Sequence, residues 1–272
     1  MQNAVEAHIM PVTVENWINE RQSRGSYTFL RSEAISGTGL TTEAVKKALQ
    51  RLVSRGRVLR VKNYFFVIVP LEYQSAGGPP VSWFIHDLMA AMRLPYYVGL
   101  LSAAAQHGAS HQQPQEFQVF TDRSVRSLTV GRARVHFFAS KFVEDAATVD
   151  IKTTTGRMRV ASPETTAVDL VRFVKAVGHL DNVATILAEL SPKLDPKKLL
   201  ASLRLVNDIP NARRLGYLLD HVDAKSLADA VHAWLKRQPT RAVPLQPGCS
   251  VSGVVEDPRW HVLGNQSIAV DT

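Results

Sequence analysis

The sequence predicts an α+β protein with an N-terminal winged helix-turn-helix domain, followed by a larger α+β domain with a small antiparallel sheet and a helical run. Three observations lead to this prediction. First, two short helices and a basic amphipathic helix precede a strand-rich stretch. Second, a Gly- and Pro-rich segment follows this stretch. Third, short strand patterns come next and are followed by several helix starts. With 272 residues, the chain is long enough for two ordinary domains.

The first domain is expected to contain three helices and a two-stranded ribbon. Residues 13–24 place apolar side chains at helical spacing, and residues 31–36 form a short second helix that ends at a glycine. The third helix is expected over Thr41 to Arg55, where a threonine caps the start and an apolar stripe faces a small core. Two strands follow within residues 57–69, with a tight turn at Lys62-Asn63 in which the asparagine tolerates a positive φ.

A linker is predicted at residues 75–80, whose sequence is SAGGPP, because paired glycines and prolines disfavour regular structure. It separates a DNA-binding domain over residues 1–74 from a second domain over residues 81–272. In the second domain we expect helices over residues 81–92 and 96–107, short strands of a mostly antiparallel sheet within 116–159, helices beginning at Pro163, Asp181 and Pro196, helices over 211–222 and 224–237, and strands over 259–263 and 267–270.

Positive charge is concentrated in the third helix and the ribbon. The net charge of +8 favours a polyanion among the partners, and nucleic acid is the first candidate. A helix fits the DNA major groove, where its outward side chains reach base edges and phosphates. The residues expected to contact DNA are Thr41, Thr42, Lys46, Lys47, Gln50, Arg51, Arg55, Arg57, Arg60, Lys62 and Asn63. The alternative is an ordinary solvated face, and the two short preceding helices together with the ribbon favour DNA.

A second group of basic residues lies in the predicted sheet. Arg132 and Arg134 alternate, as do Arg157 and Arg159, so each pair is expected on one face of a strand. This group is either a second nucleic-acid surface, a docking face for an acidic protein, or the solvated side of a sheet. Because no aromatic residue interleaves the arginines, the third interpretation is favoured.

No enzyme, cofactor or metal site is predicted. Phosphate-loop, dinucleotide-binding and nucleophile-elbow motifs are missing from the sequence. His107 and His111 lack a third metal ligand nearby, and the spacing of Glu164 and Asp169 places them on different faces of a helix. The single cysteine, Cys249, gives no disulfide, and with no signal peptide or long apolar segment the sequence predicts a soluble cytoplasmic protein without a membrane partner.

Several segments resemble the AbiEi family, the antitoxins of type IV toxin–antitoxin systems. They are YYVGLLSAAAQHGASHQQPQEFQVFT, ASPETTAVDLVRF, DNVATILAEL, NARRLGYLLD and RWHVLGNQSIAVD, and together with the N-terminal part they span about residues 13 to 271. The resemblance implies a winged helix-turn-helix that binds inverted repeats in double-stranded operator DNA and represses the family's own operon. It also implies a C-terminal domain that counters a nucleotidyltransferase-like toxin without a stable complex.

The DNA-reading segment of the family matches Thr41 to Arg55, with the ribbon from Arg57 to Phe66. The ribbon tip, VKNYFF, departs from the Arg-Gly type of turn that is usual in relatives, which leaves the phosphate contacts of the wing open. Two other functions remain possible from the residues: a transcriptional regulator whose C-terminal domain senses a ligand and has no toxin partner, and an enzyme acting on nucleic acid. A nucleotidyltransferase-like gene directly downstream would distinguish the antitoxin from the plain regulator.

Overall fold

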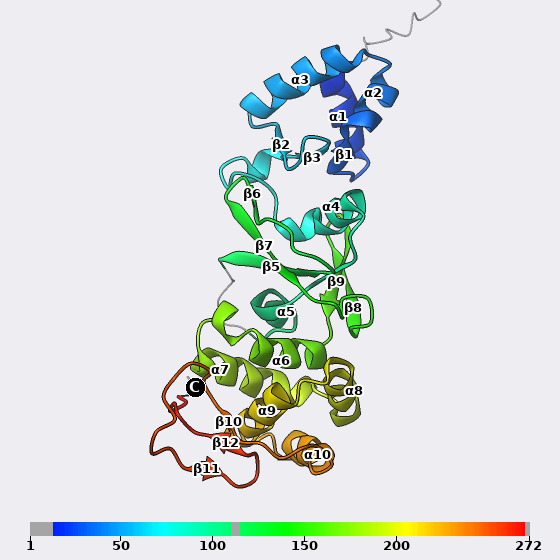
Figure 1. The fold of residues 1–272 in the computed structure, drawn as a ribbon. Coiled ribbons are helices and arrows are strands. Elements are labelled where there is room, and N and C mark those ends of the chain that lie inside the picture. The colour runs from blue at the N-terminus through cyan, green and yellow to red at the C-terminus, as the bar shows by residue number, and fades with distance from the viewer. Residues whose placement is uncertain (1–12, 110–114, 270–272) are drawn as a thin grey trace, which may run out of the picture. The chain divides into compact units, whose positions relative to one another are not determined.

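The computed structural model of the chain describes residues 13–109 and 115–269 (Figure 1). Helices and strands both contribute extensively, and a run of strands within residues 116–161 precedes a run of helices within residues 163–235, which confirms the predicted α+β class. Contacts within the chain divide it into two compact units. The first unit contains the described residues up to Arg93 together with residues 128–134 and 153–157, and the second contains the remainder from Leu94 onward.

The N-terminal part of the first unit contains three helices and a three-stranded sheet. In chain order they are α1 (Val14–Ser23), β1 (Thr28–Leu30), α2 (Arg31–Thr38), α3 (Thr42–Ser54), β2 (Val58–Arg60) and β3 (Phe65–Ile68). The central strand β3 pairs antiparallel with β1, placing Phe66 opposite Phe29, and with β2, placing Val67 opposite Leu59. The three predicted helices and the ribbon are therefore present. Strand β1 was not predicted, because three residues are too few to reveal an alternating pattern.

One apolar cluster holds these elements together. From α3, Val45, Leu49 and Leu52 are buried against the sheet and the other two helices. Phe29 and Phe66 stack in the same cluster, with ring centroids 5.4 Å apart. Full burial of one such side chain stabilises the folded state by about 1.5–3 kcal/mol, so these contacts fix the rotation of α3 about its own axis.

The segment after β3 also belongs to the first unit. It contains two 3₁₀ turns and a helix, namely η1 (Leu71–Tyr73), η2 (Val81–Trp83) and α4 (Ile85–Met92). The Trp83 ring lies 5.0 Å from the rings of both Tyr27 and Tyr73, measured between centroids. The Thr28 hydroxyl donates to the Asp87 carboxylate at 2.6 Å. These contacts connect β1 and the preceding loop to η2 and α4.

Residues 128–134 approach this segment at a pair of glycines. A Cβ atom at Gly131 would lie only 1.9 Å from the carbonyl oxygen of Gly77, and Gly131 has a φ of +59°. Only glycine combines this left-handed backbone with so close an approach of two main chains. Gly77, within the segment predicted as a linker, is therefore packed against residues that are distant in sequence.

The largest sheet has six strands in the order β6-β7-β5-β4-β9-β8. Their bounds are β4 (Tyr96–Val98), β5 (Glu116–Thr121), β6 (Leu128–Val130), β7 (Ala133–Ala139), β8 (Thr148–Thr153) and β9 (Gly156–Ala161). Strand β4 pairs antiparallel with β5, with Val98 opposite Val119, and parallel with β9, with Val98 opposite Val160.

Two helices expected in this region are shorter than predicted. Residues 96–107 do not form one helix, because the β-forming sequence Tyr-Tyr-Val enters the sheet as β4 and Gly99 separates it from α5 (Leu100–Gln106). Residues 81–92 are likewise interrupted, since Phe84 has φ −129° and ψ −5° and so leaves the helical path between η2 and α4. Both errors arise where packing in the folded protein overrides a local helical pattern.

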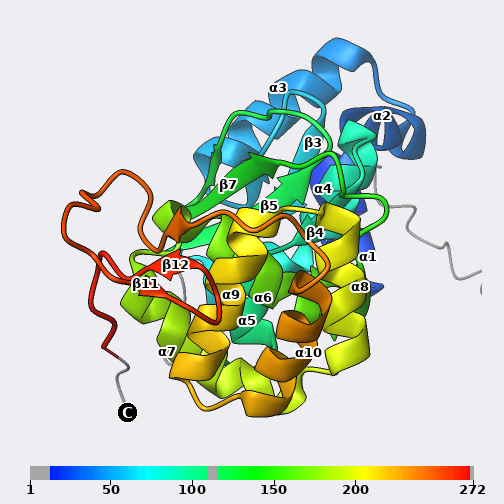
Figure 2. The same cartoon turned by 60° about the horizontal axis from the view of Figure 1, so that its bottom comes forward.

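A helical group follows the sheet in sequence (Figure 2). Its members are α6 (Pro163–Arg172), η3 (Val174–Ala176), α7 (Leu180–Leu190), η4 (Ser191–Lys193), α8 (Pro196–Val206), α9 (Ile209–His221) and α10 (Lys225–Leu235). The predicted starts at Pro163 and Pro196 are confirmed, because Ser162 accepts a bond from the backbone of Thr165 and Asp195 accepts one from that of Lys197. No helix within residues 13–109 or 115–269 is long and apolar enough to cross a bilayer.

The C-terminal segment packs on α9 through one buried tryptophan. Trp260 lies against Gly216, where a Cβ atom would come within 2.0 Å of the indole ring. The buried Arg213 guanidinium donates to the carbonyls of Trp260 and Pro239, at 3.1 and 2.9 Å. A small sheet forms here from β10 (Val243–Pro244), β11 (Glu256–Asp257) and β12 (Val262–Leu263), in the order β10-β12-β11. The strand expected over 259–263 shrinks to β12, and the expectation for 267–270 is wrong for its described part, residues 267–269.

A polar cluster is buried between β4 and α6. The Tyr97 hydroxyl donates to the Asp169 carboxylate at 2.8 Å, and Arg172 donates to the same carboxylate at 2.9 Å. Burial raises the pKa of the Asp169 carboxyl from 3.8 to about 6, although the bonds from Tyr97 and Arg172 favour the charged form. Burial and the neighbouring Asp169 charge also raise the pKa of the Tyr97 phenol.

We expect Gly131→Ala to destabilise the protein by more than about 2 kcal/mol, because the new methyl group would collide with the Gly77 carbonyl and the backbone would remain left-handed. Gly39→Ala is the matched control: Gly39 has a φ of +67°, with open space around its Cβ position. Urea denaturation of the full-length variants measures both changes. Equal losses of stability in the two variants would contradict a close approach at Gly131.

We expect Asp169→Asn to alter how the free energy of unfolding depends on pH. Because the folded-state pKa of Asp169 is raised, its contribution to stability is fully present below pH 3.8 and is lost as the pH rises through 6. The amide does not titrate, so the variant should gain about 2 kcal/mol relative to the wild type between about pH 4.5 and pH 6.5. Urea denaturation across this range measures the difference.

Asp195→Asn provides the control for this titration. Hydrogen bonds from the backbone of Lys198 and Lys197 lower the pKa of the exposed Asp195 carboxyl, so this group titrates below the measured range. The difference between Asp195→Asn and the wild type should therefore stay constant where that of Asp169→Asn changes. A constant difference for Asp169→Asn as well would mean that its carboxyl is ionised throughout.

Candidate nucleic-acid interface

Helix α3 presents its polar residues to solvent because its apolar residues are held in the core. The Thr41 hydroxyl accepts a bond from the backbone of Ala44 at 3.3 Å and so caps the helix. The predicted helix bounds agree with the structure, in which Thr41 is the N-cap and Arg55 the C-cap. The predicted DNA-contacting residues of this region that are exposed are Thr41, Thr42, Lys46, Lys47, Gln50, Arg51 and Arg55.

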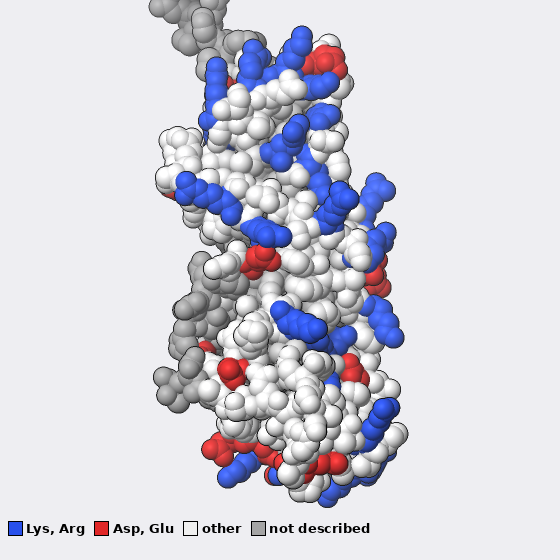
Figure 3. Space-filling model, turned by 60° about the vertical axis from the view of Figure 1, so that its left-hand side comes forward, with Lys and Arg blue, Asp and Glu red and all other residues white. Residues whose placement is uncertain are grey.

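The cations of α3 are almost free of ion pairs. Lys46 lies 3.9 Å from Glu43, in an exposed pair that contributes little to stability. Among the described residues, the side chains of Lys47 and Arg51 have no hydrogen bond or ion pair. Figure 3 shows Lys and Arg side chains gathered over this part of the surface, at the top of the view.

The ribbon, which we call the wing, comprises β2, β3 and the turn between them. The Phe65 N–H donates to the Lys62 carbonyl at 3.2 Å, so the turn is centred on Asn63-Tyr64 and not on Lys62-Asn63 as predicted. Asn63 has no positive φ, so the expectation of a left-handed asparagine there is wrong. Arg60 and Asn63 are exposed and Lys62 is half-buried.

Arg57 differs from the other predicted DNA-contacting residues. Its guanidinium donates to the Val69 carbonyl at 2.8 Å, to the Asn19 side chain at 2.9 Å and to the Gln22 side chain. These bonds connect the base of the wing to α1. Arg57 therefore stabilises the packing of the wing on α1, a role that was not predicted from the sequence.

Arg31, which was not among the predicted site residues, holds the tip of the wing. Its guanidinium donates to the Asn63 carbonyl, and its backbone N–H donates to the Tyr64 carbonyl at 2.9 Å. A cation at the first position of a helix opposes the helix dipole. That unfavourable placement is the sequence signal that could have identified Arg31 as a residue with a specific contact.

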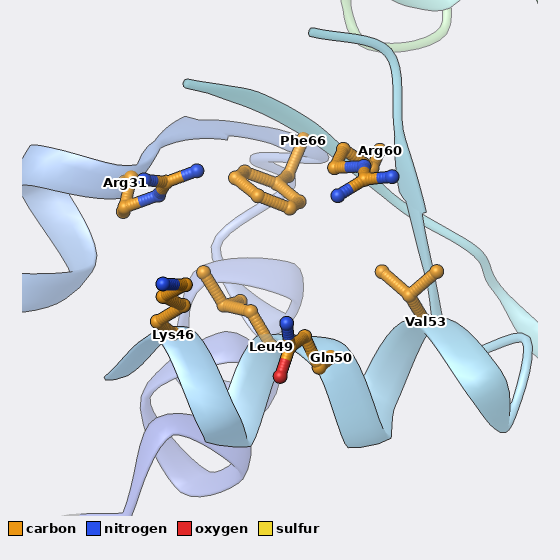
Figure 4. A pocket seen from close by; sticks show the side chains of 7 residues that line it. All are labelled: Arg31, Lys46, Leu49, Gln50, Val53, Arg60 and Phe66. Carbon is orange, nitrogen blue, oxygen red and sulfur yellow. The ribbon is translucent and has the colours of Figure 1, made fainter. Parts of the chain in front are cut away.

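A pocket of about 290 Å³ opens between α3 and the wing (Figure 4). Lys46, Leu49, Gln50 and Val53 project into it from α3. On the opposite side, Arg31 and Arg60 flank the ring of Phe66. The pocket thus brings together Lys46 and Arg60, which were predicted to contact DNA, and Arg31, which was not.

The second group of arginines is less compact than the sequence implied. Arg132 lies in the turn before β7, so it does not share a strand face with Arg134 as expected. Arg157 and Arg159 do alternate along β9, where Met158 between them is buried. Strands β7 and β9 are separated by β5 and β4, which places their backbones roughly 14 Å apart. Arg159 is half-buried, and its Nε donates to the Thr148 hydroxyl at 3.0 Å.

The residues considered for catalysis or metal binding have structural contacts. Glu164 is buried and accepts a bond from the backbone of Asp195 at 3.1 Å, so it connects α6 to α8. The His107 Nε2 atom lies 2.7 Å from the Ala161 carbonyl, and His111 lies outside the described residues. Within the described ranges, no group of three or more His, Cys, Asp or Glu residues could hold a metal ion. Cys249 is exposed.

Comparison with known proteins finds a family model that matches part of the chain. Residues 97–221 match the AbiEi antitoxin C-terminal domain. Among solved structures, the crystal structure of the RV2827C protein from Mycobacterium tuberculosis is similar, with a TM-score of 0.66 and 13% sequence identity. The similarity covers 92% of this chain and 90% of that chain, and at this identity it shows a shared fold alone. A search of curated proteins finds no match. Residues 97–221 of the chain therefore match the AbiEi antitoxin C-terminal domain, which confirms the predicted resemblance to the AbiEi family over this part of the sequence.

Proposed function

We propose that this protein is an antitoxin of a toxin–antitoxin system that also binds double-stranded operator DNA through a winged helix-turn-helix in its first unit and represses its own operon. The observation that supports DNA binding most directly is the exposed basic side of α3. Its buried side chains hold the helix against the sheet, and Lys47 and Arg51 remain unpaired among the described residues. Unpaired surface cations along one side of a helix attract a polyanion.

The geometry of α3 and the wing suits duplex DNA. An α-helix with its side chains is about 10–12 Å across, and the major groove of DNA is about 12 Å wide. The exposed Lys46, Lys47 and Arg51 would contact phosphates and guanine edges, and the Gln50 amide has the donor and acceptor needed for an adenine edge. Arg60 and Lys62 of the wing would contact the phosphate backbone, which gives affinity and not sequence preference.

The toxin partner follows from the family of the second unit. An AbiEi antitoxin domain implies a toxin, and we propose that this toxin is nucleotidyltransferase-like, is encoded beside the antitoxin and is countered without a stable complex. The operator would contain inverted repeats, so two copies of α3 would lie about 34 Å apart, or a multiple of that, on the duplex.

We expect Lys47→Ala combined with Arg51→Ala to weaken operator binding roughly 10- to 100-fold, because two phosphate contacts are lost. The slope of log affinity against log salt should fall by about 1–2 for the same reason. Fluorescence anisotropy with the labelled promoter region of the operon, over a range of salt concentrations, measures both quantities.

Arg24→Glu is the charge-matched control, because this single reversal lowers the net charge by two, as the double variant does, and Arg24 is exposed at the end of α1. It also removes positive charge from the first unit, but not from α3. Equal losses of affinity in the control and the double variant would show that net charge, and not α3, attracts the DNA. Unchanged affinity in the double variant would remove α3 from its proposed role.

We also expect the double variant, expressed from an unrelated promoter, to rescue cells from the neighbouring toxin as well as the wild type does. Lys47 and Arg51 lie outside the AbiEi domain, so the loss of DNA binding should leave toxin neutralisation intact. Point variants of the full chain are preferable to a truncation after residue 80, because α4 packs within the first unit. Cell survival and operon transcription are measured in parallel. A double variant that is folded but fails to rescue would show that the two activities are not separable.

A further inference from the structure

The pocket between α3 and the wing combines a basic opening with an apolar floor. Leu49 and Phe66 are each only 2% exposed, and Val53 is half-buried beside them. The Phe66 ring is fixed in place by stacking on Phe29, with an interplanar angle of 13°. An apolar floor of this kind is unnecessary for contacting a phosphate backbone, and it is typical of a site that encloses part of a small molecule.

Three cations surround the opening, and no carboxylate lines it among the residues that the structure describes. The Arg31 guanidinium uses one nitrogen to hold the Asn63 carbonyl, and its Nε atom is buried with no hydrogen-bond partner. Lys46 has only its long, exposed pair with Glu43. Arg60 has no hydrogen bond or ion pair within the part of the chain that the structure describes. Converging positive charges whose one counter-charge within the described ranges is the distant Glu43 carboxylate favour a bound anion.

The chemistry of this lining limits the class of ligand. Arginine guanidinium groups match the oxygens of a phosphate in pairs, and lysine adds a point charge. The Gln50 amide can donate to and accept from the edge of a heteroaromatic ring that lies over the apolar floor. A volume of about 290 Å³ is near the lower limit for ligand pockets and suits a single mononucleotide.

We propose that the pocket formed by α3 and the wing binds a free mononucleotide, with its phosphate between Arg31, Lys46 and Arg60, and that the bound nucleotide excludes DNA from α3. The nucleotide would exclude DNA because Lys46, Gln50 and Arg60 line the pocket and are also proposed to contact DNA. Only this second half of the proposal rests on the proposed DNA-binding function. Nucleotide binding itself depends on the pocket alone.

A second line of residues on α3 distinguishes the pocket from the general basic surface. Lys47, Arg51 and Ser54 border a second, more open depression together with Gln50, and of these four residues Gln50 alone also lines the pocket. Substitutions of Lys47 or Arg51 should therefore affect DNA binding without affecting the nucleotide. This difference gives the pocket a control on the same helix.

Isothermal titration calorimetry of the full chain tests the first half. The probes are GMP and AMP, with inorganic phosphate and the free nucleosides as partial ligands. We expect at least one nucleotide to bind at least about tenfold more tightly than phosphate or its nucleoside, because the nucleotide contacts both the cations at the opening and the apolar floor of the pocket. Arg60→Gln should weaken that binding at least about tenfold, whereas Lys47→Gln should leave it unchanged.

Several outcomes would overturn nucleotide binding. They are the lack of any binding at millimolar nucleotide, binding of phosphate as tight as that of the nucleotides, and equal losses in Arg60→Gln and Lys47→Gln. Both substituted side chains are exposed, so both variants should fold, and thermal unfolding checks this. Val53→Phe, which fills the pocket from its apolar side, is a second variant that should abolish nucleotide binding while the three cations remain.

Competition tests the second half. Nucleotide added to the complex with labelled operator DNA should raise the apparent dissociation constant for DNA linearly with the nucleotide concentration, by a factor of one plus the ratio of that concentration to the nucleotide Kd from calorimetry. A nucleotide that binds in calorimetry but leaves operator affinity unchanged would overturn the exclusion. A protein that binds nucleotide but no operator DNA would instead overturn the proposed DNA-binding function and leave the pocket assignment standing.

Discussion

The burial of three aliphatic side chains determines which face of α3 is available for binding. Val45, Leu49 and Leu52 are buried in the core of the first unit, and together they contribute roughly 5–9 kcal/mol to stability. The exposed pair of Lys46 with Glu43 contributes less than about 1 kcal/mol. The core therefore fixes the rotation of the helix. At 3.6 residues per turn, Lys47 and Arg51 must then face away from the sheet.

Features set by neighbouring residues could be predicted from the sequence, and features set by distant contacts could not. The starts of α3, α6 and α8 follow from the capping residues Thr41, Ser162 and Asp195, which bond to backbone groups within the next three residues. Strands β1 and β4, by contrast, have three residues each and depend on pairing with distant strands. The same limit applies to the site. The outward residues of α3 follow from helical periodicity, whereas the contacts of Arg31 and Arg57 require the fold.

The polar residues of the segment SPETTAVDL, residues 162–170, stabilise the fold through hydrogen bonds within the domain. Ser162 caps α6, Glu164 accepts from the backbone of Asp195, and the Thr165 and Thr166 hydroxyls donate to backbone carbonyls. Asp169 is bonded by Tyr97 and Arg172. Each of these groups is buried and satisfied by a partner within the domain. Residues that counter a toxin must reach another molecule, so they are to be sought among the exposed side chains of the AbiEi domain and not in this segment.

The wing depends on contacts with other elements of the first unit. Its strands β2 and β3 have three and four residues, and a hairpin this short is at best marginally stable alone. Pairing with β1 supports one edge, Arg57 ties the base to α1, and Arg31 ties the tip to the start of α2. The positions of Arg60 and Lys62 relative to α3 therefore depend on residues in α1 and α2. A loss of DNA affinity on substituting Arg31 or Arg57 would follow from displacement of the wing, even if neither side chain touched the duplex.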